Sequence, residues 1–437
     1  MSFGDLKPDR PVRKVEPPHQ DDSGWEGIQS EGSQEFTRGW KIIAASMFGL
    51  MFSQITLHTA TLGVLTPELV KAFGWTRTQV QAISVVLVFS AMLSAPVAGA
   101  LINRYGPRRV LQISIPLLSL TFVAFAFNRG SLLQFYATGA ISACLGSGTL
   151  PMAYAKVVTT WFPRRTGSAL AFAMIGPAVL STVSIPAVMW LLDLFGWRAV
   201  YVLVGATPMF VYPLVLSWLK EQPSTTGAVE ASPQLVGESL PEAIRQWRMW
   251  VMGFAFMATA AAVGGCLVNL PTLLADVGLH REQVMMVAPA LGGCAIIGRL
   301  VGGGMLDRWW APGVTLIFLL LLAAGLAVLA HPSLSPLTAA VALGLIGFSS
   351  GVENDLLAYM VSRYFGMRAY ASVYGVLQLV SGVGGGLSPV FFSLAHDLTG
   401  SFKAVLFGAC GVISLSGFVS LALGRYRYFN APPLALA

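Results

Sequence analysis

The sequence predicts an all-α membrane protein in which twelve transmembrane helices form two pseudo-symmetric six-helix bundles. Three observations support this fold class: an apolar composition, long continuous apolar runs and an internal repeat. Hydrophobic residues fill 55% of the 437 positions and charged residues only 11%, which is far more apolar than a soluble protein of this length. The apolar runs are continuous, whereas the strands of a membrane barrel alternate between apolar and polar residues. They therefore indicate helices, which pair their own backbone N–H and C=O groups in lipid.

The apolar runs are each long enough to cross roughly 30 Å of hydrocarbon as a helix. We expect six in the first half of the chain and six in the second. They cover residues 41–66, 80–102, 109–127, 132–160, 167–192, 198–219, 249–274, 283–306, 313–330, 336–362, 370–395 and 403–424.

The two halves share residues at a constant separation of 204 positions. Pro67 recurs as Pro271 and Arg104 as Arg308, and Gly74, Gln79, Gly99 and Asp193 recur in the same way. A repeat of about 200 apolar residues in one orientation is typical of a transporter built from two six-helix halves. The solute site is then expected between the halves.

The segments outside the runs predict the domain organisation and the orientation. Residues 1–38 are expected to be a disordered cytoplasmic tail, because the first 37 hold eight of the 20 acidic residues and no apolar core. Residues 39–219 and 249–424 form the two bundles, 220–248 a cytoplasmic linker and 425–437 a C-terminal tail. Of the 27 Lys and Arg, 19 lie on the side of both termini, which places that side in the cytoplasm. We expect a plasma-membrane protein, or an inner-membrane one in a bacterium.

A loop rich in glycine and arginine follows the second run and recurs after the eighth. It reads Gly99-Ala-Leu-Ile-Asn103-Arg104-Tyr-Gly106-Pro-Arg108-Arg109, and the copy reads Gly303-Gly-Met-Leu-Asp307-Arg308. Glycine lets helices approach closely, and Arg can pair with carboxylates or helix C-termini. The loop resembles the Gly-x-x-x-Asp-Arg-x-Gly-x-Arg-Arg motif of the major facilitator superfamily, with Asn103 at the place of the usual Asp. The resemblance implies conformational locking rather than substrate binding by Gly99, Asn103, Arg104, Gly106, Arg108, Asp307 and Arg308.

Further stretches resemble the branch of this superfamily that contains the monocarboxylate porters and the oxalate:formate antiporters. They are Gly63-Val-Leu-Thr-Pro67-Glu-Leu-Val-Lys-Ala-Phe73-Gly-Trp-Thr-Arg77, Trp161-Phe-Pro-Arg-Arg165-Thr-Gly167, Arg363-Tyr-Phe-Gly366 and Asp397-Leu-Thr-Gly-Ser401. The resemblance covers about residues 39–424. It implies a secondary transporter of a small organic monocarboxylate, coupled to protons, in which the two halves rock about a central site.

Arg299 is the cation placed deepest in a predicted helix. It precedes Asp307 by about eight residues, or roughly 12 Å of helix. An ionisable side chain at that depth is costly and so indicates function. In the resembling families an Arg at this point binds the substrate carboxylate, which the guanidinium fork matches bidentately. The alternative is a structural partner for Glu353 or Asp355.

Glu353 and Asp355 are the two acids placed deep in the tenth run. Two positions along a helix correspond to a rotation of about 200°, so both cannot face one cavity. Asp355 shares a stripe with small residues typical of helix packing. We therefore expect Glu353 to face the cavity and carry the coupled proton. A buried structural ion pair is the alternative for either acid.

Other polar residues complete the candidate substrate site: Gln54, His58, Asn269, Gln378 and Ser381. His58 could relay protons or be a hydrogen-bonded packing residue. Ser381 stands where the oxalate:formate type carries Lys, which argues against a dicarboxylate substrate. Lys156 is close enough to a helix end to snorkel to the cytoplasmic interface.

The sequence contains no phosphate loop, metal-spaced histidine cluster or nucleophile elbow, so we expect secondary transport and no enzyme activity, cofactor or metal. The four cysteines fit neither a zinc site nor a disulfide pair. The expected partners are a carboxylate, a proton and the lipid bilayer; topology explains the net charge of +7 without nucleic acid, and the chain is expected to be monomeric. The alternatives are an exporter of hydrophobic or cationic compounds, an anion:anion exchanger, and a membrane sensor or integral membrane enzyme.

Overall fold

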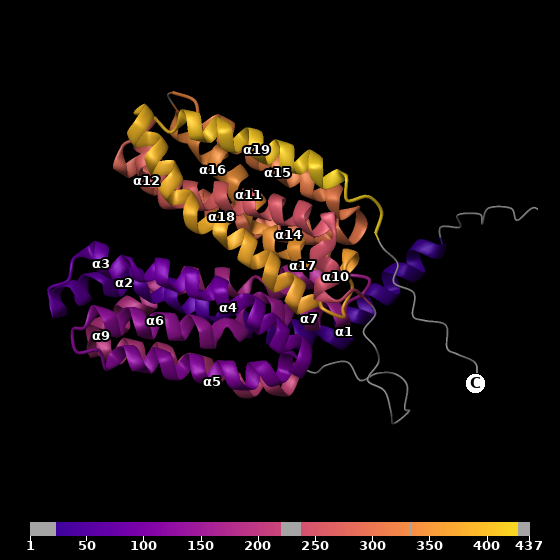
Figure 1. Cartoon of the computed structure of the whole chain (residues 1–437), viewed down its shortest axis with the longest axis horizontal. Coiled ribbons are helices and arrows are strands. Elements are labelled where there is room, and N and C mark those ends of the chain that lie inside the picture. The colour runs from indigo at the N-terminus through magenta and orange to yellow at the C-terminus, as the bar shows by residue number, and fades with distance from the viewer. Residues whose placement is uncertain (1–22, 220–236, 333, 427–437) are drawn as a thin grey trace, which may run out of the picture.

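The computed structural model describes residues 23–219, 237–332 and 334–426. Within these ranges the chain is helical, and its β-structure is limited to one isolated bridge between Gly237 and Gly366. Figure 1 shows two bundles of long helices that meet at one end of the molecule and diverge towards the other.

The N-terminal bundle holds the first six predicted crossings. The first consists of α1 and α2, the second of α3 and α4, and the third of α5. The fourth is interrupted by a 3₁₀ turn, η1, and the fifth and sixth share α8 and α9, which kinks at Gly196 (φ 75°, ψ 168°). The elements are α1 (Ser23–Met51), α2 (Gln54–Phe73), α3 (Arg77–Gln81), α4 (Ile83–Tyr105), α5 (Pro107–Ala126), α6 (Leu132–Gly146), η1 (Ser147–Thr149), α7 (Pro151–Trp161), α8 (Thr166–Ala173) and α9 (Gly176–Trp218).

The C-terminal bundle repeats this plan with breaks in its first, second and fourth crossings. Its elements are α11 (Trp247–Val268), α12 (Leu270–Asp276), α13 (Arg281–Val287), α14 (Pro289–Arg308), α15 (Ala311–Leu329), α16 (Pro336–Gly351), α17 (Glu353–Tyr364), α18 (Tyr370–Thr399) and α19 (Lys403–Leu421). Ten spans in the described parts of the chain are long and apolar enough to cross a membrane. The interrupted fourth crossing of the N-terminal bundle is not among these ten, and the fifth crossing of that bundle contributes the shorter apolar stretch Thr166–Leu180.

Parts of the predicted tail and of the predicted linker are helical where the structure describes them. The helix α1 begins at Ser23, before the first predicted apolar run at residue 41, and its Phe36 ring packs on Phe162 at 5.4 Å between ring centroids. The linker forms α10 (Leu240–Arg245), which Ser239 and Glu242 cap reciprocally. The remaining parts of the predicted tails and linker, 1–22, 220–236 and 427–437, lie outside the described residues.

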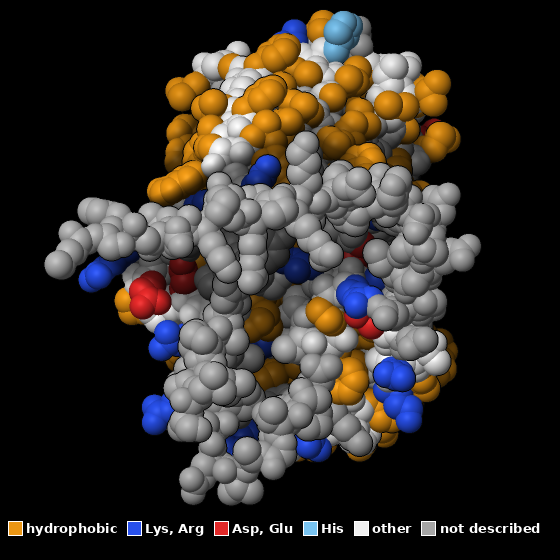
Figure 2. Space-filling model, turned by 90° about the vertical axis from the view of Figure 1, so that its right-hand side faces the viewer, with side chains coloured by type: hydrophobic (Ala, Val, Ile, Leu, Met, Phe, Trp, Pro, Cys, Tyr) orange, Lys and Arg blue, Asp and Glu red, His pale blue; other side chains and the backbone are white. Residues whose placement is uncertain are grey.

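Glycines allow the two bundles to touch at the end where α1 begins and α19 ends (Figure 1). A Cβ atom on Gly99 of α4 would lie 2.3 Å from the carbonyl oxygen of Ala371 in α18. A Cβ atom on Gly303 of α14 would lie 2.7 Å from the carbonyl oxygen of Gly167 in α8. Figure 2, which looks at this end, shows more Lys and Arg than Asp and Glu side chains there. We call this end of the molecule, where α1 begins and α19 ends, the tail end.

Backbone contact between α14 and α16 gives the first testable prediction. A Cβ atom on Gly347 would lie 2.0 Å from the Leu291 carbonyl oxygen, and one on Gly298 would lie 1.9 Å from that of Phe348. We expect Gly347→Ala to lower the melting temperature of the purified protein, since overpacking costs about 1–3 kcal/mol. Gly304→Ala on α14, where no atom lies within 4 Å of the new Cβ, is the matched control and should melt like the wild type. Equal melting of the two variants would contradict this account of the packing.

Candidate functional site

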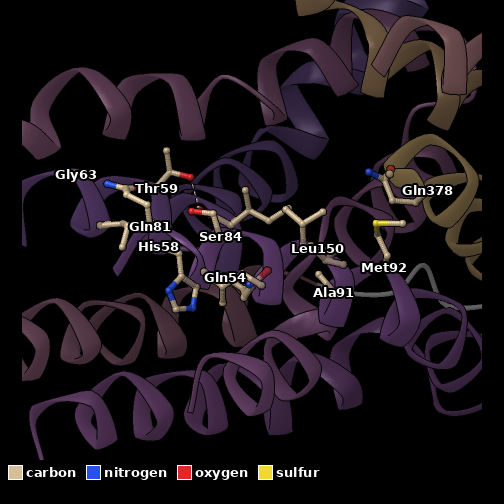
Figure 3. A pocket seen from close by; sticks show the side chains of 15 residues that line it. Gln54, His58, Thr59, Gly63, Gln81, Ser84, Ala91, Met92, Leu150 and Gln378 are labelled. Carbon is tan, nitrogen blue, oxygen red and sulfur yellow. Dashed lines mark hydrogen bonds between the residues drawn. The ribbon is translucent and has the colours of Figure 1, made fainter. Parts of the chain in front are cut away.

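A cavity with a volume of about 420 Å³ lies between the two bundles (Figure 3). Its described lining comes from α2, α3, α4 and α18 together with Leu150, and none of these residues is Lys, Arg, Asp or Glu. We call it the neutral cavity. It is lined by Gln54, Ile55, His58, Thr59, Leu62, Gly63, Gln81, Ser84, Leu87, Val88, Ala91, Met92, Leu150, Gln378 and Gly382.

Gln54 and His58 reach the neutral cavity because α1 ends at Met51 and the chain restarts as a helix at Gln54. The Gln54 backbone N–H donates to the Thr149 Oγ1 at 3.1 Å, which ties this start to η1. The His58 Nε2 lies 3.1 Å from the Ser142 Oγ on α6, and its ring centroid lies 4.5 Å from that of Phe122. His58 therefore has a packing role in the N-terminal bundle in addition to its place at the cavity wall.

Arg299 lies at a second cavity of about 550 Å³ between α9, α14 and α16. Its Nε is 3.3 Å from the Asp355 Oδ2 and donates to the Gly351 carbonyl at 2.9 Å. Its Nη1 donates to the carbonyl of Met174, which follows α8 in the opposite bundle. The guanidinium thus joins the two halves of the molecule, and we call this space the arginine cavity.

The two deep acids of α17 face different helices. Asp355 is 0% exposed and is paired by charge with Arg299, although neither of its oxygens has a hydrogen-bond partner in the described structure. Glu353 is partly buried, and its Oε1 lies 3.4 Å from the Ser381 Oγ on α18. The Ser381 hydroxyl also lies 3.3 Å from the Phe256 carbonyl. Between the two partners that the sequence left open for Arg299, the structure places Asp355 against it.

Asn269 lines neither the neutral cavity nor the arginine cavity. Its Nδ2 donates to the Gly265 and Pro389 carbonyls at 3.0 and 3.3 Å, and its Oδ1 accepts from the Ser393 Oγ at 3.0 Å. It therefore fixes the end of α11 to α18. Helical periodicity alone could not distinguish that position from a cavity-facing one.

Asp307 and Asn103 each contact the start of a helix in the opposite bundle at the tail end. The Asp307 carboxylate accepts from the Gly167 N–H at 2.6 Å, the Ser168 N–H at 3.0 Å and the Ser168 Oγ at 2.5 Å, at the N-terminus of α8. The Asn103 Oδ1 accepts from the Ala371 N–H at 3.2 Å, and its Nδ2 donates to the Ser372 Oγ at 2.8 Å. These partners are separated by the same 204 positions as the two loops. The repeat in the sequence is thus also a repeat of contacts.

The arginines of the loops differ from these two residues in that they are exposed. Arg104, Arg108 and Arg308 lie at the protein surface, and the Arg104 guanidinium lies 5.3 Å from the centroid of the Tyr105 ring. Gly106 adopts φ 84°, which a residue with a side chain rarely adopts. It makes the turn between α4 and α5.

Lys156 does not extend to the interface as predicted. It is 7% exposed, and its Nζ donates to the Asn103 Oδ1 at 3.0 Å and to the Ile102 carbonyl at 3.4 Å. The equivalent position of the second half is Met360, so the repeat carried no signal for this cation. Sequence reasoning also missed Tyr154 and Tyr374, whose buried hydroxyl oxygens have no hydrogen-bond partner in the described structure.

Comparison with known proteins identifies the family and the fold. The model of the Major Facilitator Superfamily matches residues 43–389. Monocarboxylate transporter 11 of Mus musculus is 27% identical over 89% of this chain and 88% of its own length. The 3-(3-hydroxy-phenyl)propionate transporter of Escherichia coli is 27% identical over 84% of each.

The solved structure of the Escherichia coli fucose:proton symporter has the same fold. It superposes with a TM-score of 0.66 at 16% identity, over 88% of this chain and 98% of its own. The predicted fold class and the predicted resemblance to the monocarboxylate branch are confirmed. The chain, with its two six-helix bundles, belongs to the major facilitator superfamily of transporters.

Proposed function

We propose that this protein is a secondary active transporter of a small organic monocarboxylate, coupled to protons. The observation that carries the proposal is Arg299, a guanidinium at membrane depth that contacts both halves of the molecule. A planar fork of N–H donors matches a carboxylate better than an ammonium does. The names of two relatives, a monocarboxylate transporter and a phenylpropionate transporter, support the same class of solute.

A substrate carboxylate at Arg299 would compete with the contact that now joins the halves. The Nη1 of Arg299 donates to an uncharged carbonyl, that of Met174, and a charged carboxylate is the stronger acceptor. Asp355 can stay paired with the Nε edge while the other edge of the guanidinium binds substrate. Binding at this place would thus be coupled to movement between α8 and α14.

Glu353 is the residue we assign to the proton. Its carboxyl group has a single hydrogen bond in the described structure, a long one from the neutral Ser381 hydroxyl, and one such donor is poor compensation for a charge at membrane depth. A protonated carboxyl group avoids that cost. Asp355, in contrast, has a cation beside it and can remain ionised.

Glu353→Gln separates proton coupling from substrate binding. In proteoliposomes we expect uptake driven by a pH gradient to disappear, whereas exchange of labelled for unlabelled acid at equal pH persists, because the amide resembles the protonated acid in shape. Asp355→Asn is the matched variant and should weaken substrate binding through Arg299 instead. Loss of gradient-driven uptake with retained exchange in Asp355→Asn alone would reverse the two assignments.

The conformation that the structure presents is closed at the tail end. The majority of the Lys and Arg lie on that side, which favours placing it in the cytoplasm of a plasma or inner membrane. We therefore assign the structure to an outward-facing state. In the opposite state the contacts of Asn103 and Asp307 would be broken, because the two halves move relative to each other.

A further inference from the structure

We infer that the neutral cavity receives the uncharged body of the transported acid, and that this body is an aromatic or branched skeleton that carries a hydroxyl group. The inference rests on the proposed transport of a monocarboxylate and names its substrate class. It is based on three features of the cavity: its lack of charge, its apolar wall and its unpartnered amide oxygens.

Because the neutral cavity has no charged residue in its described lining, it suits the uncharged part of the substrate and not the carboxylate. A carboxylate without a cation beside it is costly to enclose, and no described residue lining the neutral cavity carries a charge. Arg299 lines the arginine cavity instead, and both cavities are bounded by residues of both halves. We assign the carboxylate to Arg299 and the uncharged part of the same molecule to the neutral cavity.

The apolar wall favours a skeleton larger than that of a two- or three-carbon acid. Leu87, Val88 and Met92 of α4 face the space together with Ile55 and Leu62 of α2. Each methylene group buried against such a wall improves affinity about fourfold. A volume of about 420 Å³ leaves room for a ring or a branched chain, whereas a short acid would leave these side chains in water.

The unpartnered amide oxygens add a requirement for a donor. The Gln54 side chain is 1% exposed, and its Oε1 has no hydrogen-bond partner in the described structure. The Oε1 of Gln378, on the opposite half, is also buried without a hydrogen-bond partner in the described structure. Both side chains border the cavity (Figure 3). Neither a carboxylate nor a hydrocarbon can donate to them, but a hydroxyl group can. We assign the hydroxyl contact to Gln54, because it is the more deeply buried of the two.

The test compares three acids on the purified full-length protein in lipid nanodiscs: propionate, 3-phenylpropionate and 3-(hydroxyphenyl)propionate. We expect the phenyl compound to bind more tightly than propionate, and the hydroxyl group to add about a further tenfold. In Gln54→Leu, which keeps the side-chain volume, the two phenyl compounds should bind equally. Gln112→Leu on α5 is the matched control, because Gln112 lines neither cavity; it should keep the tenfold preference.

The outcomes distinguish this inference from the proposed function. If the wild type binds and transports all three acids with equal affinity, the proposed function stands and the inference fails. If it transports none of them, the proposed function fails. A hydroxyl preference that survives in Gln54→Leu, with phenylpropionate binding intact as evidence of folding, removes Gln54 from the site. If Gln54→Leu does not fold, the wild-type affinities alone decide.

Discussion

Arg299→Lys is expected to abolish carboxylate transport although it keeps the positive charge. The Nε of Arg299 lies 3.3 Å from Asp355 while its Nη1 reaches across to the Met174 carbonyl of the other half. An ammonium concentrates its charge at one point and cannot hold Asp355 on one edge and a substrate carboxylate on another. We expect the rate of uptake in proteoliposomes to fall at least about a hundredfold. The reason is that the substitution removes a charge-assisted, bidentate contact worth about 3 kcal/mol.

Arg299→Ala tests a different consequence of the same geometry. It leaves Asp355, which is 0% exposed, without its cation, and removal of one partner of a buried ion pair costs about 3–5 kcal/mol of stability. The melting temperature of Arg299→Ala should therefore fall, and the double variant Arg299→Ala/Asp355→Ala should recover most of it.

Transport by the double variant decides between the two roles of Arg299. If Arg299 binds substrate, the double variant folds but does not bind or move the acid. If the double variant transports at the wild-type rate, Arg299 is only the structural partner of Asp355. Arg245→Lys, on the exposed surface of α10, is the control for an arginine-to-lysine change away from the site and should transport normally.

Sequence periodicity predicted the direction of a side chain on its helix more successfully than the neighbour that it meets. The rotation between Glu353 and Asp355 requires them to face different surroundings, and the structure places them against α18 and α14. Nothing along α17 itself shows that Arg299 covers the face of Asp355, because that depends on how two helices cross. Their roles in transport stay predictions.

At the tail end, the sequence repeat predicts some of the contacts between helices but not others. The 204-residue repeat identifies Asn103 and Asp307 as equivalent positions in the two halves. Their hydrogen-bond partners, Ala371 and Gly167, are equivalent positions of the same repeat. The repeat does not predict the contact of Lys156, since its counterpart is Met360 and its contact with Asn103 joins α7 to α4. Asn269 is a candidate for the substrate site because it is a polar residue in an apolar run, and polarity does not distinguish a cavity wall from the contact between α11 and α18 where it lies.

Asp307→Asn is expected to shift the protein towards the state that is open at the tail end. The carboxylate accepts three hydrogen bonds from Gly167 and Ser168 and places negative charge at the N-terminus of α8. An amide has one acceptor oxygen, and its NH₂ group would meet an N–H donor. The closed end would lose about 1–3 kcal/mol, which changes the ratio of the two states by roughly 5- to 150-fold. Asn103→Asp should act in the opposite direction, because a carboxylate beside Lys156 and the Ala371 N–H makes charge-assisted hydrogen bonds.

Two reporter cysteines measure this shift in a background without Cys144, Cys266, Cys294 and Cys410. Thr159→Cys reports on the tail end, since the Thr159 hydroxyl contacts the Met367 sulfur of the other half at 3.8 Å, and Ser84→Cys reports on the neutral cavity. With Asp307→Asn, modification by a thiol reagent should become faster at position 159 and slower at position 84, because alternating access couples the two openings. Faster modification at both positions would indicate loosening of the fold instead. Unchanged rates at both positions would mean that the Asp307 contacts do not hold the tail end closed. The contacts that keep it closed would then be those of Asn103 and Lys156 and the glycine contacts between α4 and α18.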